Sequence, residues 1–352
     1  MSKPAGRFHA LDSLRGVGAF FVLFIHCLQT LHVYDLFPNA TVGSQLQLSE
    51  VFLYTPFRVL VNGRSLVMFF FVLSGFVLAY GLHNSRQKAN FWLYLKRRFA
   101  RIYLPFAGTG VMAFIFMQLP GWPLQGDIVG YFLLSGTTAG LAPNALAWSL
   151  VYELRVSLFI PLLCWLCWQH ERKTFIAMIF LAIFQWIGIF GLHIGQFPYG
   201  SDSLMGATVI TVRYLIAIYI GIWLAKCIIE QRAWLDKVQG KWIPIIGVIT
   251  YCLMNISLDE PGMLGSIGII VLVFRSKAFS NFLEMPVSLW LARISYSLYL
   301  THFLILHLGW YYLPIDNNVL RIFVAALCAF AYGELYQRLV EAPAIKLAKS
   351  IK

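Results

Sequence analysis

Apolar residues lie along this chain in blocks of about 15 to 25, and short polar segments separate the blocks. A helix needs about 20 apolar residues to cross the hydrocarbon of a bilayer, so each block is typical of a transmembrane helix. The pattern predicts an all-α, polytopic membrane protein with ten transmembrane helices. Their expected ranges are 13–31, 65–82, 102–119, 146–168, 175–191, 206–226, 242–257, 262–274, 289–312 and 319–340.

One further apolar segment, residues 127–139, is too short to cross a bilayer comfortably. If it did cross, Arg172 and Lys173 would move to the outer side together with every later basic loop. We therefore predict that this segment is re-entrant or interfacial.

Lysine and arginine gather in alternate loops, as the positive-inside rule requires of cytoplasmic segments. Both ends of the chain carry residues of this basic set, so we expect both termini to be cytoplasmic. The opposite side receives segments poor in Lys and Arg, including 32–58, 120–145 and 192–205. The expected cytoplasmic basic residues are Lys3, Arg7, those within 86–101, Arg172, Lys173, Arg232, Lys237, Lys241, Arg275, Lys277, Lys346, Lys349 and Lys352.

The composition excludes an ordinary soluble protein. Of the 352 residues, 59% are hydrophobic and only 12% are charged, and the mean hydropathy is +0.72; soluble domains have about 25% charged residues. The net charge of +12 fits basic cytoplasmic loops better than a nucleic-acid partner, so we expect none. Because the polar segments are short, we expect residues 1–352 to form one integral membrane domain in a lipid bilayer, without an appended soluble domain.

Two local patterns have simple interpretations. Residues 86–101 (RQKANFWLYLKRRFAR) mix aromatic and basic side chains, which predicts an amphipathic helix on the cytoplasmic surface that binds anionic lipid headgroups. Cys164 and Cys167 have a spacing that metal sites use, but no second pair and no nearby His-x-x-His accompany them. We predict no metal.

Arg15 and His26 share one face of the first predicted helix. They are eleven residues apart, close to three turns, so their side chains point the same way and lie about 16 Å apart along the axis. Ionisable residues inside spans cost about 2.5–3.5 kcal/mol each, which makes them candidates for function. Arg15 at the rim can hold an anion, and a deep, neutral His26 can accept a proton from a hydroxyl. The alternative is a structural histidine bonded to a neighbouring carbonyl.

Glu153 lies in an apolar part of the fourth predicted helix, where an unpaired carboxylate is strongly disfavoured. Arg155 is two residues away and cannot face it on a helix, whereas Arg213 is a candidate partner. Glu153 could therefore orient His26, bind a polar substrate or neutralise an arginine.

The ninth predicted helix carries His302 and His307, which differ in facing by about 140°. We expect at most one of them to face a pocket, and we favour His302 because a polar run that includes Tyr299 precedes it. Ser74 is small and stands beside a glycine, so it either packs helices together or lines the pocket.

Six blocks of this sequence resemble acyltransferase family 3, in the order seen in that family and over nearly the whole chain. They include the Arg-x10-His pair of Arg15 and His26, the SGF block that begins at Ser74, and the Arg-x-x-Arg pair of Arg98 and Arg101. The blocks are LDSLRGVGAFFVLFIH (11–26), MFFFVLSGFVLAY (68–80), YLKRRFARIYLP (94–105), WSLVYELRVSLFIPLL (148–163), RISYSLYLTHF (293–303) and VEAP (340–343).

The resemblance implies a ten-span O-acetyltransferase of the O-antigen or exopolysaccharide type in the inner (plasma) membrane. Such an enzyme moves acetyl from acetyl-CoA to a hydroxyl of a cell-surface polysaccharide or its lipid-linked precursor. His26 matches the family's essential histidine, and Arg15, Arg98 and Arg101 match its functional arginines. Guanidinium groups suit the phosphates of CoA, which cannot enter hydrocarbon, so only the pantetheine arm would extend towards His26.

We therefore predict His26 and Glu153 as catalytic residues and Arg15, Arg98 and Arg101 as residues that bind acetyl-CoA. A second set is predicted to line the substrate pocket. This set is Ser74, Tyr299 and His302. The acceptor hydroxyl could attack the thioester directly with His26 as the base, or a covalent acyl-histidine could form first.

The main alternative is a membrane transporter, since Arg, His and Glu near the midplane also form substrate and proton pathways. The sequence shows no inverted repeat to support it. The membrane-bound O-acyltransferases, which use an Asn/His pair, rank third, because the strongest signals here begin at the N-terminal end with Arg15 and His26.

Overall fold

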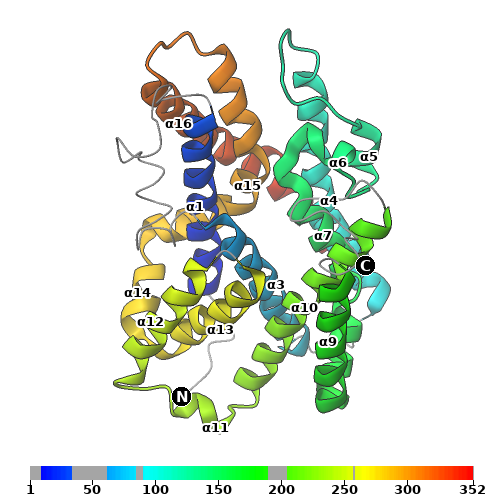
Figure 1. Cartoon of the computed structure of the whole chain (residues 1–352), viewed down its shortest axis with the longest axis vertical. Coiled ribbons are helices and arrows are strands. Elements are labelled where there is room, and N and C mark those ends of the chain that lie inside the picture. The colour runs from blue at the N-terminus through cyan, green and yellow to red at the C-terminus, as the bar shows by residue number, and fades with distance from the viewer. Residues whose placement is uncertain (1–8, 34–61, 85–89, 189–203, 257, 352) are drawn as a thin grey trace.

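The protein consists of helices that lie side by side around one long axis (Figure 1). The computed structural model describes residues 9–33, 62–84, 90–188, 204–256 and 258–351. Each predicted span coincides with a helix or with a bent pair of helices. The helices are α1 (His9–Val33), α3 (Gly63–Asn84), α4 (Phe91–Phe116), α5 (Ile128–Phe132), α6 (Thr138–Leu141), η2 (Ala142–Ala147), α7 (Trp148–Ser157), α8 (Ile160–Gln169), α9 (Glu171–Trp186), α10 (Leu204–Ile229), α11 (Ala233–Asp236), α12 (Trp242–Asn255), α13 (Asp259–Arg275), α14 (Lys277–Leu283), α15 (Pro286–Tyr312), α16 (Asn318–Tyr336), η4 (Gln337–Glu341) and α17 (Ala342–Ser350).

Within the described residues, six helices are long and apolar enough to cross a membrane, or up to eight if each of two bent pairs is one span. The segment from α6 to α7 meets α8 at 53°, and α13 meets α14 at 97°. α9 and α12 coincide with predicted spans but have only 16 and 14 residues. The structure therefore supports a polytopic membrane protein, and the full count of ten spans stays a prediction.

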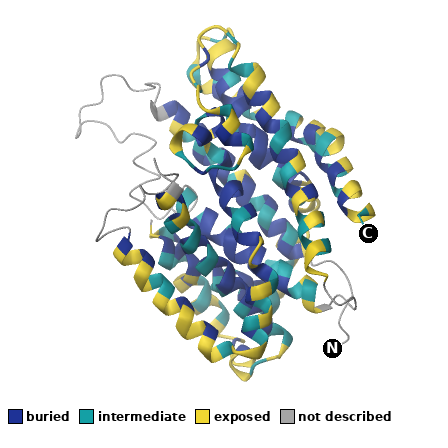
Figure 2. Cartoon of the chain, turned by 90° about the vertical axis from the view of Figure 1, so that its right-hand side faces the viewer, coloured by how far each residue is buried: buried dark blue, intermediate teal, exposed yellow. Residues whose placement is uncertain are grey.

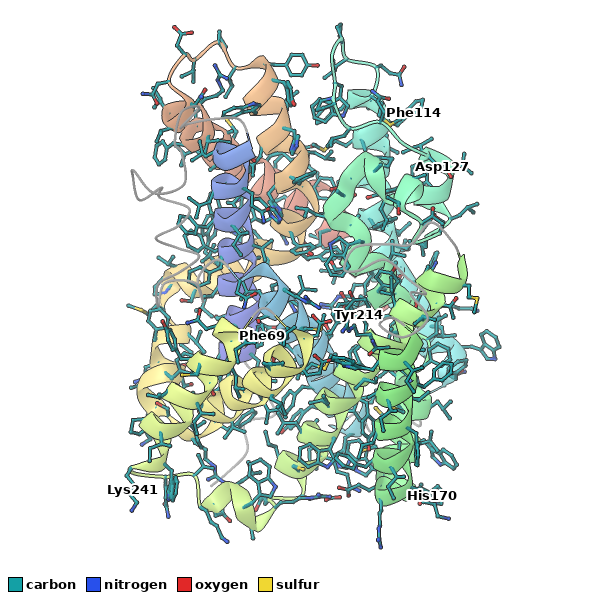
Figure 3. All side chains as sticks on the ribbon, viewed as in Figure 1. Phe69, Phe114, Asp127, His170, Tyr214 and Lys241 are labelled. Carbon is teal, nitrogen blue, oxygen red and sulfur yellow. The ribbon has the colours of Figure 1, made fainter. Side chains whose placement is uncertain are left out.

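Lys241 and Asp127, one residue from each predicted set of loops, lie towards different ends of the long axis (Figure 3). Figure 3 shows His170 and Lys241 at one end, and Phe114 and Asp127 towards the other. Lys241 belongs to the predicted cytoplasmic set, whereas Asp127 belongs to the predicted outer set. Which end faces the cytoplasm stays a prediction.

Part of the loop prediction has no counterpart in the structure. Lys3 and Arg7 lie outside the described residues, and so do most of the segments 32–58 and 192–205. The cytoplasmic position of the N-terminus therefore rests on the sequence pattern.

The short apolar segment 127–139 does not form a spanning helix. It contains α5 and the start of α6, and a turn joins the two. The guanidinium of Arg155 on α7 donates hydrogen bonds to the carbonyls of Leu134 (2.7 Å) and Ser135 (2.5 Å), which fixes this turn against the bundle. The segment thus forms no helix long enough to span, and its re-entrant or interfacial position stays a prediction.

The basic segment 86–101 is not a separate helix, which corrects the prediction. α4 begins at Phe91 and continues without a break to Phe116, so the basic residues occupy the first turns of the third predicted span. Asn90 caps this helix, because its side chain accepts hydrogen bonds from the backbone N–H groups of Trp92 (3.0 Å) and Leu93 (3.3 Å). Residues 85–89 lie outside the described ranges.

Side-chain burial follows the bundle arrangement. Buried residues fill the interior and exposed residues follow the outward faces (Figure 2). Many of the exposed side chains are large and apolar, such as Phe180 (67% exposed) and Phe184 (64%) on α9. A water-soluble surface would not carry this many, so these faces fit contact with lipid.

α3 and α10 pack so closely that their backbones touch. A Cβ atom at Gly75 of α3 would lie 2.1 Å from the carbonyl oxygen of Ile218, and one at Gly221 of α10 would lie 1.9 Å from that of Val72. Small residues permit such contacts between membrane helices. This contact matters for the site because α3 carries Arg64 and Ser74.

We expect Gly75→Ala to destabilise the protein although alanine favours helix, because the new methyl group meets the α10 backbone. Gly81→Ala on the same helix is the matched control, since nothing lies within 4 Å of the added Cβ. Thermal unfolding in detergent should show a lower Tm for Gly75→Ala, by several degrees, and an unchanged or higher Tm for Gly81→Ala. Equal Tm values for the two variants would contradict the close α3–α10 contact.

Candidate active site

Four arginines line a cavity of about 410 Å³, which we call the vestibule. Arg15 comes from α1, Arg98 and Arg101 from α4, and Arg293 from α15. Three carboxylates also line it. They are Asp12, Glu153 and Glu341. The vestibule thus brings together the three arginines that the sequence singled out, and its walls carry a small excess of positive charge.

Two further cavities continue from the vestibule. A narrow one of about 60 Å³, the neck, shares Arg15, Glu153, Ser295 and Tyr296 with the vestibule. A third one of about 340 Å³, the inner chamber, contains His26 and shares Val67 and Tyr299 with the neck. The three cavities therefore follow one another through the protein, from the arginines to His26.

One face of α1 lines all three cavities. Arg15 borders the vestibule and the neck, Ala19 borders the neck, and Val22 and His26 border the inner chamber. Their spacing of four, three and four residues is that of one helical stripe. The prediction that Arg15 and His26 point the same way is confirmed.

Glu153 forms an ion pair with Arg98 at the junction of vestibule and neck. Its Oε1 lies 2.6 Å from a terminal nitrogen of Arg98 and accepts a hydrogen bond from Ser74 Oγ at 3.1 Å. Both charged side chains are largely shielded from solvent, at 11% exposure for Arg98 and 21% for Glu153. Three roles were considered for Glu153, and the contact that the structure shows is the one that neutralises an arginine, Arg98.

The partner of His26 is His302 on α15. The two rings approach with His26 Nδ1 3.0 Å from His302 Nε2. His302 Nδ1 lies 2.8 Å from the carbonyl oxygen of Leu298, which can only accept, so this nitrogen carries the hydrogen. In a neutral His302, Nε2 then accepts, and His26 Nδ1 donates to it. The lone pair of His26 is consequently on Nε2, as a general base requires.

Tyr299 and Ser74 both line the neck. The Tyr299 hydroxyl lies 2.7 Å from Ser149 Oγ, and its ring packs edge-on against His302. His307 hydrogen-bonds to the carbonyl of Phe303 in its own helix and lines none of the three cavities. His302 lines none of them either, so its predicted place in the pocket lining is not shown; its described contact with the site is the one with His26.

Two other arginines in the predicted spans have carboxylate partners of their own. Arg213 is not the partner of Glu153, which corrects the prediction: its Nε lies 2.6 Å from Asp259 Oδ2. The bundle brings the start of α13 beside α10, which sequence spacing does not reveal. Arg293, at the outer wall of the vestibule, donates two hydrogen bonds of 2.8 Å to Glu334.

The vestibule suits a phosphate-bearing donor. Arg98 Nε is buried and has no hydrogen-bond partner among the residues that the structure describes. A buried guanidinium nitrogen without an acceptor is costly, and a phosphate oxygen would satisfy it. In the same described ranges, no three His, Cys, Asp or Glu side chains gather in a way that could hold a metal ion.

Sequence reasoning missed three polar residues of the inner chamber. Gln29 of α1, Arg64 of α3 and Asp259 of α13 all line it. Arg64 gave one usable signal, because it is an arginine on the side of the predicted membrane that is otherwise poor in basic residues. No such signal marked Asp259, because an acidic residue in a predicted loop is ordinary.

Comparison with known proteins shows the family of this chain. The model of the acyltransferase 3 family, described as an acyltransferase domain, matches residues 8–333. The chain belongs to the acyltransferase 3 family. The model is that of an acyltransferase domain, so the transporter alternative has no support from the family.

A curated relative is the acyltransferase MdmB of Streptomyces mycarofaciens, which is 30% identical over 167 residues. The match covers 44% of this chain and 39% of MdmB, so the chain spans well under half the length of that relative. No solved structure matches this chain.

We expect Arg98 and Glu153 to be thermodynamically coupled. Arg98→Gln and Glu153→Gln should each lower the Tm, because each leaves the other charge shielded and unpaired, and the double variant should lose less than the sum of the two. A coupling free energy of about 1–2 kcal/mol is expected for a pair that solvent partly reaches. Glu284→Gln, at an exposed carboxylate, is the control and should leave the Tm unchanged. Strictly additive effects would contradict the pair.

Proposed function

We propose that this acyltransferase is an O-acetyltransferase of the inner (plasma) membrane. It moves acetyl from cytoplasmic acetyl-CoA to a hydroxyl of a cell-surface polysaccharide or of its lipid-linked precursor. The observation that carries the proposal is the series of cavities that joins four arginines to His26. A thin arm with a charged nucleotide at one end and a thioester at the other matches this series in shape and in charge.

The arginines of the vestibule bind the nucleotide end of the donor. Guanidinium forks bind phosphate well, and Arg98 has a buried nitrogen that lacks an acceptor. Glu153 holds the guanidinium of Arg98 at the opening of the neck, so we assign it a positioning role rather than direct contact with the base. Ser74 and Tyr299 border the passage for the pantetheine arm.

His26 acts as the general base in the inner chamber. Its Nε2 accepts the proton of the acceptor hydroxyl while the hydroxyl oxygen attacks the thioester carbonyl. The carbon–sulfur bond then breaks, and the proton passes from Nε2 to the leaving sulfur of CoA. Direct transfer is favoured over an acyl-histidine, because acylation at Nε2 would leave His26 with no basic nitrogen for the second step.

His26→Ala should lower acyl transfer at least 100-fold, because the variant loses the proposed general base and no second histidine lines the chamber among the described residues. The measurement is incorporation of label from radiolabelled acetyl-CoA into envelope carbohydrate, in membranes with matched amounts of folded protein. His307→Ala is the control, since this histidine lies on the same bundle but lines none of the cavities. Full incorporation of label by His26→Ala would exclude His26 as the general base. If the wild-type protein incorporated no label, the proposed reaction would be excluded.

His302 positions His26, and a second variant series tests this role. His302→Phe should reduce kcat by about 10- to 100-fold with little change in the KM for acetyl-CoA, since the tautomer of His26 is no longer fixed. His302→Gln should recover part of the rate, because its carbonyl oxygen can accept from His26 Nδ1–H. Equal kcat values for His302→Phe and wild type would contradict the tautomer argument, and no difference between the Phe and Gln variants would point to packing alone.

A further inference from the structure

The inner chamber has polar groups that the proposed chemistry of His26 does not use. The most prominent is the carboxylate of Asp259, which lies between two arginines. Arg64 Nε donates to Oδ1 at 2.5 Å, and Arg213 Nε lies 2.6 Å from Oδ2. The side chain of Asp259 is only 1% exposed, so it must carry its charge inside the protein.

The two arginines that contact Asp259 differ in whether they line the chamber. Arg213 is 2% exposed and lies behind Asp259, where it does not line the chamber. Arg64 is 24% exposed and lines the same chamber as His26. Of the two guanidinium groups on Asp259, that of Arg64 is therefore the one that a ligand in the chamber would contact.

The residues that line the chamber suit a ligand with one sugar-sized ring. Gln29, about one turn beyond His26 on α1, lines the chamber and is itself exposed, so among the described residues the chamber reaches the surface at this side chain. Phe303 packs edge-on against His26 and gives the wall an aromatic face, and Val22 and Met68 add apolar surface. Aromatic and apolar walls with a few amide and guanidinium groups suit the C–H faces and hydroxyls of a sugar.

The charge around Asp259 and the volume of the chamber restrict the class of ligand further. Around Asp259, two arginines face two carboxylates, because Glu260 lies 3.7 Å from Arg213. This balance favours a neutral group over a phosphate or a carboxylate, in contrast to the vestibule. A volume of about 340 Å³ is near the lower end for small-ligand sites, which fits one ring and the transferred acyl group but not an oligosaccharide.

We propose that the inner chamber is the acceptor site, that it takes one neutral sugar ring at a time, and that Arg64 and Gln29 hydrogen-bond the ring hydroxyls beside the one that is acylated. Asp259 is a positioning residue that holds Arg64. The donor and the acceptor thus enter from opposite ends of the cavity series and meet at His26. This inference rests on the proposed function, because it takes His26 as the base.

The first test separates donor from acceptor effects. In membranes with native envelope carbohydrate and radiolabelled acetyl-CoA, Arg64→Gln should lower the rate at saturating donor at least 10-fold. The donor concentration at half-maximal rate should stay within twofold of wild type. Arg101→Gln in the vestibule should show the opposite pattern, with a raised half-maximal donor concentration. Arg64→Gln keeps Arg213 as the partner of Asp259, and unchanged acetyl-CoA binding by the purified variant shows that it is folded.

The second test blocks the chamber without knowledge of the acceptor sugar. Gln29→Cys is treated with a bulky, polar, membrane-impermeant maleimide, and treated wild type controls for the six native cysteines. Labelling of Cys at position 29, verified by mass spectrometry, should lower transfer more than 10-fold while acetyl-CoA binding stays within twofold. Failure to label would contradict the open end of the chamber, and retained transfer would overturn the acceptor site.

The outcomes distinguish the inference from the function on which it rests. If wild type transfers label, His26→Ala does not, and Arg64→Gln matches wild type, the acceptor site is wrong while the proposed reaction stands. Loss of acetyl-CoA binding on maleimide treatment would make the chamber a donor site instead. If wild type transfers no label, the proposed function and this inference both fail.

Discussion

Hydrocarbon offers no hydrogen bonds, so every charge inside this protein must be satisfied by another part of the protein or by a ligand. The structure meets this constraint through pairs that join distant helices: Arg98 with Glu153, and Arg213 with Asp259. One group stands apart from this pairing in the described part of the chain: Arg98 Nε is buried without an acceptor. Arg98 lines the vestibule, where a ligand can supply that acceptor, and Arg64, which is paired with Asp259, lines the inner chamber.

α1 provides the axis of the site. A single stripe of its residues borders the vestibule, the neck and the inner chamber in turn, so a rigid helix sets the distance between Arg15 and His26. α15 packs along α1 and supplies His302, which fixes the tautomer of His26, and Tyr299, which borders both neck and chamber. The chemistry of the site therefore depends on the packing of these two helices.

The separation of charge along the cavities gives the proposed reaction its direction. The arginine-rich vestibule suits a phosphorylated donor, and the charge-balanced inner chamber suits a neutral acceptor. A passage of about 60 Å³ between them admits only a thin chain. In the proposed reaction each substrate therefore stays at its own end, and only the reacting groups share the space around His26.

The sequence by itself determined the apolar spans, the common face of Arg15 and His26, and the family, because these depend on helical periodicity and on motifs within single segments. Only the tertiary structure decided that Glu153 pairs with Arg98, that Arg213 pairs with Asp259, and that Arg64 lies in the chamber of His26. Partners on different helices are set by how the helices pack, and a single sequence does not encode that arrangement in any local pattern.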